Sequence, residues 1–528
     1  MKLNRVRSRS LLEEGKRKKN MTQGTSISVD GHSLTTDQVV KIARGYERVE
    51  ITSQALQKVR EGRKSVERIL KSGKTIYGLN TGFGRLSDVR IKSDQLDELQ
   101  LNLIRSHAVG TGRSLSVDEV RAVMAVRLNT LLRGNSGIRP DVAQQLQRFL
   151  NKGIHPDIPR YGSLGASGDL APSAHLALAL VGEGYVIDES GRKLPTKSIL
   201  RRKNVSPIKL KAKEGLAIIN GTQVMTGLGC LLLNDSNSLL FNLDVAAAMT
   251  LEALRGSQAS FESRIHQLRP LHGQAHVASR ILRLIRDSSL IGTSNRIQDP
   301  YSLRCVPQVH GAFLDALQYL NQVLEVELNS VTDNPIIFPE TDDVVSSGNF
   351  HGQPISLALD LLGVALASAS VISERRINKL LSSFNPELPL FLAKESGLNS
   401  GLMVLQYTAA SLVAENRVLA RPSSVDSADV SGGQEDHASM GVTSALKARK
   451  IWRNTTKVIA LELMCAAQAI DLLQNGKLGQ GTSIAYSLIR KYTQTVEKDR
   501  SLSDDLERVA RALENDELRR AIEGTVQL

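Results

Sequence analysis

The chain has 528 residues, of which 41% are hydrophobic and 23% are charged. This balance is typical of globular proteins and excludes a chain that is disordered throughout. Only 4% of the residues are aromatic, so the core must be mainly aliphatic. The formal net charge of +13 permits binding to nucleic acid or to a membrane surface but does not establish either.

Much of the positive charge lies at the N-terminus. Residues 1–20 contain eight basic and two acidic residues. Charged termini of this kind are usually solvated, so we expect a disordered basic tail over 1–20. The alternative is an arm that binds nucleic acid, and the methionine that follows at Met21 leaves open where the mature chain begins.

The cysteines and the apolar segments indicate the compartment. Cys230, Cys305 and Cys465 are too widely spaced for a disulfide framework or a paired metal motif, which favours a reducing environment. The N-terminus lacks the apolar core of a signal peptide. The longest apolar stretch, Leu361 to Ile372, is too short to span a bilayer. We therefore expect a soluble, cytoplasmic protein.

Along the chain, the first 215 residues are the less regular part, with glycine-rich turns at 77–84 and 161–168. Within them, Ser116 and Glu119 have the spacing of a capping box, and apolar residues at helical spacing follow as far as Gly134. A basic stretch at 192–213 reads as a surface connection. Helical patterns then dominate at 223–254, 308–330, 354–376, 401–420, 445–475 and 503–523.

These patterns predict a mainly α-helical protein. We expect three parts: the tail at 1–20, an N-terminal region of mixed helices and loops at 21–215, and a bundle of long helices with a C-terminal helical region at 216–528. Small residues are frequent on the long helices, which allows the helices to approach one another closely.

Three small residues, Ala166, Ser167 and Gly168, stand together in a glycine-rich segment. In a sharply bent loop, the Gly168 nitrogen could bond to the Ala166 carbonyl carbon with loss of water. Dehydration of Ser167 would then leave a five-membered ring with an exocyclic methylene, which is an electrophile. Taken alone, the three residues are more typical of a tight turn before a helix at 171–182. A serine nucleophile elbow is excluded because the second glycine of that motif is missing.

The wider segment, GSLGASGDLAPSAHLA, strongly resembles the histidine and aromatic amino-acid ammonia-lyase family. Further blocks match in the family's order between about Val29 and Arg508: TIYGLNTGFG, EGLAIINGTQ, IQDPYSLRCVPQV, SVTDNPIIF, SGNFHGQP and SVDSADVSGGQEDHASMG. The resemblance implies a helical fold of the ammonia-lyase and fumarase–aspartase type. It also implies that Ala166-Ser167-Gly168 forms a 4-methylidene-imidazol-5-one (MIO), with no dissociable cofactor.

The resemblance assigns roles to several further residues. Tyr77 would remove the β-proton of the substrate, which requires its phenol to be stabilised as phenolate. Arg304 would hold the substrate α-carboxylate with its forked guanidinium, and Tyr301 would lie beside the electrophile. If their segment is helical, the spacing of these two residues puts them on one face. Asn220 and Gln298 would join the carboxylate site.

The choice of amino acid depends on two places. Ser106-His107 matches the position that reads the substrate side chain, and histidine-specific members have Ser-His there, although tyrosine lyases also use a histidine. Glu435, in Gln434-Glu435-Asp436-His437, can pair with an imidazole, whereas plant-type phenylalanine lyases have an amide instead. Phe350 would pack on the substrate ring.

The resemblance thus implies elimination of ammonia from L-histidine to give trans-urocanate. The enzymatic alternative is a tyrosine or phenylalanine ammonia-lyase, or an aminomutase, on the same MIO chemistry. The resemblance also implies a homotetramer with each site built from three subunits, acting on a small amino acid and not on a membrane or nucleic acid. The non-enzymatic alternative is a catalytically silent scaffold protein whose basic tail binds nucleic acid.

A metal site is not expected. His266, His272 and His276 cluster in one short stretch, but Pro270 and Gly273 interrupt a helix there. No His-Glu-x-x-His motif or cysteine pair accompanies them.

Overall fold

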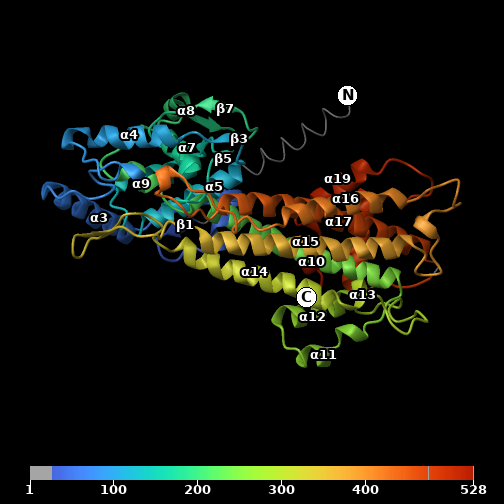
Figure 1. Ribbon diagram of the computed structural model, residues 1–528. Coiled ribbons are helices and arrows are strands. Elements are labelled where there is room, and N and C mark those ends of the chain that lie inside the picture. The colour runs from blue at the N-terminus through green and yellow to red at the C-terminus, as the bar shows by residue number, and fades with distance from the viewer. Residues whose placement is uncertain (1–25, 474, 527–528) are drawn as a thin grey trace. The chain divides into compact units, whose positions relative to one another are not determined.

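The computed structural model describes residues 26–473 and 475–526 (Figure 1). The predicted tail, residues 1–20, lies outside the described residues. The chain divides into two compact units. The first comprises the described parts of Met1–Cys230, Glu325–His351 and Asp429–Asp436, and the second comprises those of Leu231–Leu324, Gly352–Ala428 and His437–Leu528. The domain boundary placed after residue 215 stays a prediction.

The first unit combines short strands with helices of moderate length. Strand β1 pairs in parallel with β2, while β3 with β5, β8 with β9, and the order β4-β6-β7 are antiparallel. The strands are β1 (Ser26–Val29), β2 (Arg48–Ile51), β3 (Thr111–Ser114), β4 (His155–Pro156), β5 (Pro159–Tyr161), β6 (Tyr185–Ile187), β7 (Lys193–Pro195), β8 (Ile336–Phe338) and β9 (Asp343–Val345). The helices are α2 (Thr36–Val40), α3 (Ser53–Lys71), α4 (Leu96–His107), α5 (Val117–Leu131), α6 (Pro140–Lys152), α7 (Leu170–Leu180), α8 (Thr196–Arg202) and α9 (Glu214–Ile219).

All the long elements of the second unit are helices. Two helices, α10 (Gln223–Ala253) and α14 (Val306–Leu328), continue from one unit into the other along the chain. The rest are α11 (Ser263–Gln267), α12 (His272–Leu284), α13 (Tyr301–Arg304), α15 (Gln353–Leu381), α16 (Met403–Leu419), α17 (Gly441–Leu472), α18 (Gln480–Tyr492), α19 (Ser503–Glu514) and α20 (Glu517–Glu523). The prediction of a mainly α fold with long helices is confirmed.

The helices that the sequence predicted begin and end close to where it placed them. At the start of α5, the Glu119 carboxylate accepts a hydrogen bond from the Ser116 backbone N–H at 2.8 Å, as a capping box requires. The prediction at 503–523 was wrong in one respect, because the segment contains two helices. Asp516 has a φ of +60°, a left-handed conformation that separates α19 from α20 and lets α20 begin in a new direction.

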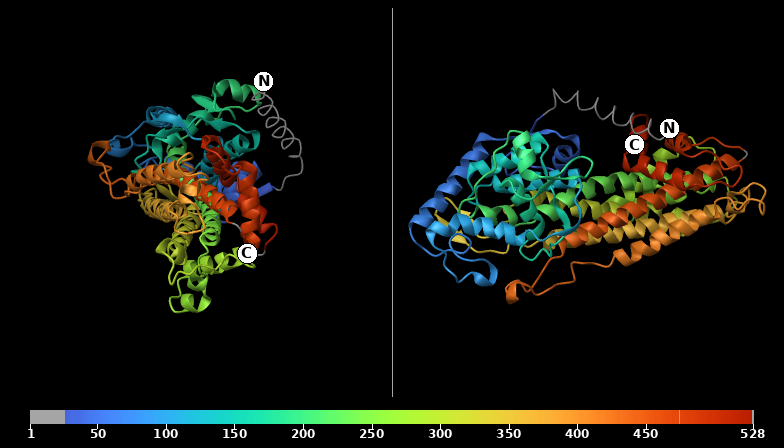
Figure 2. Two further views of the ribbon diagram at one scale, coloured as in Figure 1. Left: turned by 90° about the vertical axis from the view of Figure 1, so that its right-hand side faces the viewer. Right: turned by 90° about the horizontal axis from the view of Figure 1, so that it is seen from above.

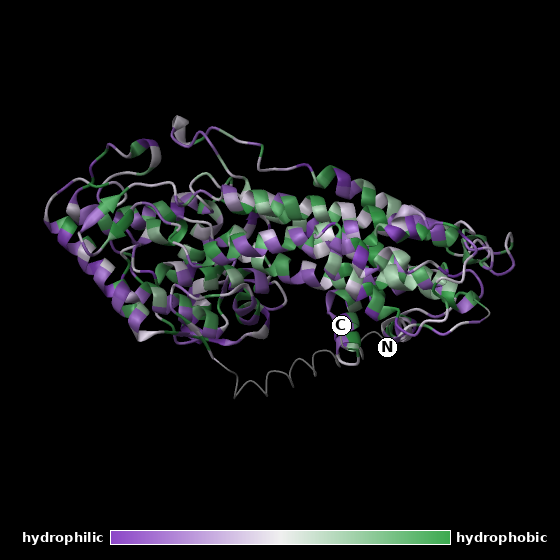
Figure 3. Cartoon of the chain, turned by 90° about the horizontal axis from the view of Figure 1, so that it is seen from below, coloured by the Kyte–Doolittle hydropathy of each residue, from purple (hydrophilic) through white to green (hydrophobic). Residues whose placement is uncertain are grey.

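Helices α15, α16 and α17 form the core of the second unit, with α15 and α17 side by side (Figures 1 and 2). Hydrophobic and hydrophilic residues alternate along the long helices (Figure 3). Among the described residues, α15 alone has the length and composition of a membrane span. However, 67% of its apolar window is buried inside the protein, as in a core helix of a soluble protein. The cytoplasmic location stays a prediction.

A buried charge network ties these helices together. Arg376 on α15 donates to both carboxylate oxygens of Glu462 on α17, at 2.5 and 2.9 Å. Thr250 on α10 and Ser373 on α15 also donate to Glu462, at 2.8 and 2.6 Å. Both charged side chains are fully buried. Because four hydrogen bonds satisfy the carboxylate, the pair is stable in an apolar core, where an unpaired charge would not be.

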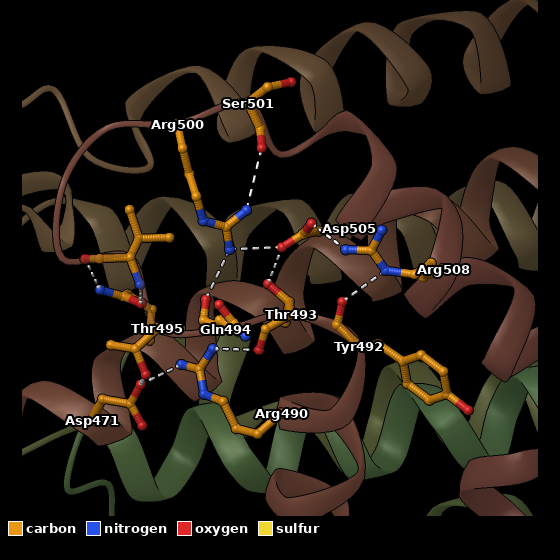
Figure 4. A network of polar contacts seen from close by, with 12 residues as sticks. Asp471, Arg490, Tyr492, Thr493, Gln494, Thr495, Arg500, Ser501, Asp505 and Arg508 are labelled. Carbon is orange, nitrogen blue, oxygen red and sulfur yellow. Dashed lines mark hydrogen bonds and ion pairs between the residues drawn. The ribbon is translucent and has the colours of Figure 1, made fainter. Parts of the chain in front are cut away.

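A second polar network joins α17, α18 and α19 near the end of the chain (Figure 4). Asp505 on α19 accepts hydrogen bonds from Thr493 and Arg500 at 2.8 Å each and from Arg508 at 2.5 Å. Asp471 on α17 pairs with Arg490 on α18 at 2.7 Å. These contacts fix the C-terminal helices against α17.

Candidate active site

The Ala166-Ser167-Gly168 segment lies in a tight bend between β5 and α7. Gly168 has a φ of +77°, and its backbone forms a bridge with Gly221. A Cβ atom on Gly168 would lie 2.3 Å from the Gly221 carbonyl oxygen, which is closer than real Cβ atoms come to backbone. Only glycine therefore fits at this position, because both the backbone conformation and the approach exclude a side chain.

Asn220 holds the loop from the other side. It follows α9 directly, and its side-chain amide donates a hydrogen bond to the Ser167 carbonyl oxygen at 3.0 Å. The residue is 3% exposed, and within the described part of the chain its Oδ1 atom has no hydrogen-bond partner. A buried acceptor of this kind calls for a donor from a bound molecule.

Glu435 is brought to the same loop from far along the chain. The segment 430–435 closes on itself through paired backbone hydrogen bonds between Val430 and Glu435, at 3.1 and 3.2 Å. The Glu435 carboxylate accepts a hydrogen bond from the Ser167 hydroxyl at 3.0 Å. A carboxylate therefore stands directly beside the serine of the Ala-Ser-Gly segment.

Tyr77 lies in the glycine-rich turn 77–84, where its hydroxyl accepts a 3.5 Å hydrogen bond from the Gly84 N–H. Burial raises the pKa of Tyr77 above its ordinary value. The Gly84 hydrogen bond opposes that shift, whereas the negative charge of Glu435 raises the pKa further. Glu435 therefore influences how readily this phenol loses its proton.

His107 is the last residue of α4, and its position follows from where that helix ends. Its Nδ1 atom lies 2.9 Å from the Leu103 carbonyl oxygen, so Nδ1 carries the proton and Nε2 is the free acceptor of the neutral ring. Burial lowers the pKa of His107, and the Leu103 hydrogen bond and the charge of Glu435 oppose that shift. The imidazole is thus mostly neutral near pH 7.

The sequence analysis missed one supporting residue, Asp169. Its backbone N–H donates to the Gly221 carbonyl oxygen at 2.7 Å, and its carboxylate accepts from the N–H groups of Val224 and Met225 at 2.8 and 3.0 Å. Burial raises the pKa of Asp169 to about 7, against these hydrogen bonds and one from Ser163. Asp169 therefore fastens the loop to the first turn of α10. The sequence signal that could have pointed to Asp169 is its position directly after Gly168.

Gln298, Tyr301 and Arg304 lie together in the second unit. Tyr301 and Arg304 form the short helix α13, and the Arg304 guanidinium lies 4.6 Å from the centre of the Tyr301 ring, so the spacing does put them on one face. In the amide orientation that its neighbours favour, Gln298 accepts hydrogen bonds from Arg304. Tyr301 is 71% exposed. Arg304 makes no ion pair with a carboxylate among the described residues, and its guanidinium is held by the Gln298 amide.

Phe350 is half-buried in the turn 347–351 of the first unit, and its contact with a substrate ring stays a prediction. The three histidines that cluster in the sequence each have a protein partner: His266 contacts Gln274, His272 contacts Gln318, and His276 contacts Arg280, at 2.9, 2.9 and 2.7 Å. Over 26–473 and 475–526, no group of three or more potential metal ligands occurs.

Comparison with known proteins places the chain in a family. The sequence pattern of the aromatic amino acid lyases matches residues 34–491. A histidine ammonia-lyase from Alkaliphilus oremlandii is 46% identical over 504 residues, which cover 95% of this chain and 99% of the relative. One from Treponema denticola is 48% identical over 493 residues, covering 93% and 97%. The chain belongs to the aromatic amino acid lyase family.

Solved structures agree with this assignment. A tyrosine aminomutase from Streptomyces globisporus has a TM-score of 0.91 at 38% identity, with 96% of this chain and 99% of that chain covered. A histidine ammonia-lyase from Trypanosoma cruzi has a TM-score of 0.88 at 39% identity, with 95% and 96% covered. The protein is therefore a carbon–nitrogen lyase that acts on a small amino acid.

Proposed function

We propose that the protein eliminates ammonia from L-histidine to give trans-urocanate. The observation that carries this proposal is the Glu435 carboxylate, hydrogen-bonded to Ser167 at 3.0 Å and electrostatically coupled to His107. An imidazole ring can pair with that carboxylate. A phenyl ring would desolvate the charge without compensating it, at a cost of several kcal/mol. The two relatives named above, both histidine ammonia-lyases, support the same substrate.

The residues present fit formation of the MIO group from Ala166, Ser167 and Gly168. Gly168 lacks the Cβ that would block a tight bend, and Asn220 holds the Ser167 carbonyl oxygen. Glu435 holds the hydroxyl that would be lost. When formed, the group supplies an electrophile toward amines, which no ordinary side chain offers.

Tyr77 is the base in this proposal. In the free site its raised pKa keeps the phenol protonated near neutral pH. The positive charge of a bound imidazolium, or a hydrogen bond from a neutral imidazole, offsets the charge of Glu435. Burial is the main cause of the raised pKa and Glu435 a smaller one, so pairing of the carboxylate with the substrate ring would lower the pKa of Tyr77 in part, which is the direction that a base requires.

Arg304 binds the substrate α-carboxylate. Its guanidinium offers a planar fork that matches two carboxylate oxygens, and the Tyr301 ring and the Gln298 amide hold that fork in place. Asn220 contributes its unpaired Oδ1 atom as an acceptor for the substrate ammonium group.

We further propose that the enzyme is a homotetramer whose sites are shared between subunits. The outward stripe of α15 supports this, because Leu357, Leu361 and Val364 are 47%, 42% and 45% exposed on an otherwise core helix. Val404 and Tyr407 on α16 are 54% and 63% exposed. Apolar surface on this scale is typical of subunit interfaces. Light scattering of the purified protein tests the mass of the assembly.

The test of activity compares three substrates. Purified protein is incubated with L-histidine, L-tyrosine or L-phenylalanine, and the conjugated acid product is followed by ultraviolet absorbance. We expect the highest kcat/KM with L-histidine. Intact mass spectrometry of the same preparation should show a chain lighter than its encoded mass by two waters. Full encoded mass would refute the MIO group, and faster turnover of L-tyrosine would refute the substrate.

The second candidate is a tyrosine ammonia-lyase or aminomutase. The structural similarity to tyrosine aminomutase, with a TM-score of 0.91, and the presence of His107 favour it. An aminomutase returns the amine to the β-carbon, so chromatography would find a β-amino acid and little free ammonia. Stoichiometric ammonia release from L-histidine would exclude this candidate.

A further inference from the structure

A cavity of about 750 Å³ lies in the first unit, and the Ala-Ser-Gly loop does not line it. Its walls come from strands β3 and β5, the start of α5, and the turn 188–191 between β6 and β7. Small-molecule sites commonly have volumes of roughly 300–1,000 Å³, so this cavity is large enough for an organic ligand. None of the residues proposed for the lyase reaction lines it.

Two arginines face each other across the β3–β5 ladder. Thr111 pairs with Tyr161 and Ser114 pairs with Pro159, so the register shifts between these pairs and sets Gly112 and Arg113 opposite the single residue Arg160. Both Arg113 and Arg160 line the cavity. Like charges at facing positions of a strand pair destabilise it unless a counter-charge lies between them.

The bulge that creates this arrangement depends on glycine. Gly112 has a φ of +86°, and a Cβ there would lie 2.6 Å from the Tyr161 ring. Bulges of this kind redirect a neighbouring side chain and are frequent next to binding sites. Here the redirected side chain is Arg113, which is exposed and makes no ion pair within the described chain.

Arg160 has a counter-charge, but the hydrogen bonding of its guanidinium is incomplete. Its nearest carboxylate oxygen, on Glu119, is 3.5 Å away, and that oxygen already accepts the 2.8 Å hydrogen bond from the Ser116 backbone. The Arg160 Nε atom is buried and has no hydrogen-bond partner among the described residues. A guanidinium with an unpaired, buried N–H is an incomplete hydrogen-bonding site.

The other charges on the walls are already occupied. Arg44 pairs with Asp118 at 3.1 Å, and Lys193 pairs with Asp157 at 2.7 Å. Asp188 accepts hydrogen bonds from within its own turn, and Glu189 also lines this wall and has an interaction of its own. Among the lining arginines and lysines, Arg113 is therefore the one without a carboxylate partner within the described chain, and Arg160 has only the long contact with Glu119.

We propose that this cavity binds a small organic oxyanion, whose phosphate or carboxylate group bridges Arg113 and Arg160. Two guanidinium forks suit the planar or tetrahedral oxygens of either group. Because Asp188 and Glu189 also line the cavity, it favours a ligand that carries its negative charge at one end. None of its lining residues belongs to the proposed lyase site, so this ligand would be distinct from the amino-acid substrate.

The probes are inorganic phosphate and succinate, titrated into the native assembly by calorimetry at constant ionic strength. We expect saturable binding of at least one probe to the wild-type protein. If phosphate binds and succinate does not, the site selects a phosphate group, and the reverse result indicates a carboxylate. Arg113→Gln should weaken binding by about tenfold or more, because one charge-assisted contact is lost. Arg60→Gln, which changes an exposed arginine on α3, is the matched control.

A second variant keeps the test independent of folding defects. Arg113→Glu places a carboxylate beside Arg160, where the ligand anion would lie. It should raise the melting temperature measured without added anion and should abolish the response to the probes. The proposal is overturned if neither probe binds the wild-type protein, if Arg113→Gln binds as tightly as Arg60→Gln, or if Arg113→Glu lowers the melting temperature.

Discussion

Replacement of Gly168 by alanine tests whether the tight bend of the Ala-Ser-Gly segment is required for the chemistry. The change adds one methyl group to a residue with a φ of +77°, opposite the Gly221 backbone. Gly73→Ala is a matched control, because Gly73 has a φ of +72° but nothing lies within 4 Å of the position that its Cβ would take. The two substitutions share the same conformational penalty and differ only in crowding.

The size of the effect follows from the contacts. A side chain in the left-handed region costs about 1–2 kcal/mol, and both variants bear that cost. In Gly168→Ala the Cβ would also lie 2.3, 2.6 and 2.7 Å from the O, C and N atoms of Gly221, so the two backbone segments must separate. Separation breaks the 2.7 Å hydrogen bond from Asp169 to Gly221, which costs a further ~0.5–1.5 kcal/mol.

Intact mass spectrometry separates the two variants most clearly. We expect Gly73→Ala to lose two waters as the wild-type chain does, whereas Gly168→Ala should keep its full encoded mass and have no lyase activity. Circular dichroism establishes that both variants are folded. If folded Gly168→Ala loses both waters and turns over L-histidine normally, the reasoning from the close approach to Gly221 is refuted.

Three other predictions concern binding, pH and stability. Arg304→Lys should lower kcat/KM by about tenfold or more, because a point charge replaces the fork that binds the carboxylate; unchanged steady-state kinetics would contradict this. Burial lowers the pKa of His155 to about 3, so the unfolded chain binds its proton more readily and stability should fall by about 1.4 kcal/mol per unit as the pH drops from about 6.5 toward 3. His155→Gln should reduce that slope in denaturant titrations, and an unaltered slope would count against it. Glu462→Ala should cost about 3–5 kcal/mol by leaving Arg376 unpaired in the core, whereas the exposed Glu514→Ala should leave thermal unfolding almost unchanged.

The sequence by itself determined the helices and the family. Apolar residues at helical spacing mark α10, α14, α15 and α17 to within a few residues, because a helix that packs in a core must repeat its apolar positions every three or four residues. The capping box before α5 is equally local, since its hydrogen bonds join residues three apart. Such features depend only on neighbours along the chain.

Contacts between distant segments could be decided only by the tertiary structure. The hydrogen bond between Ser167 and Glu435 joins residues 268 positions apart, and no spacing in the sequence encodes it. Asp169 could be read as a residue after a glycine, but not as the group that fastens the loop to α10. The outward stripe of α15, with Leu361 as one example, has the same apolar pattern as the buried side, so periodicity could not say which face the core would cover. Burial, interactions between charges and close approach of backbone segments all arise from tertiary packing. Packing therefore determines the chemical properties of the residues at this site.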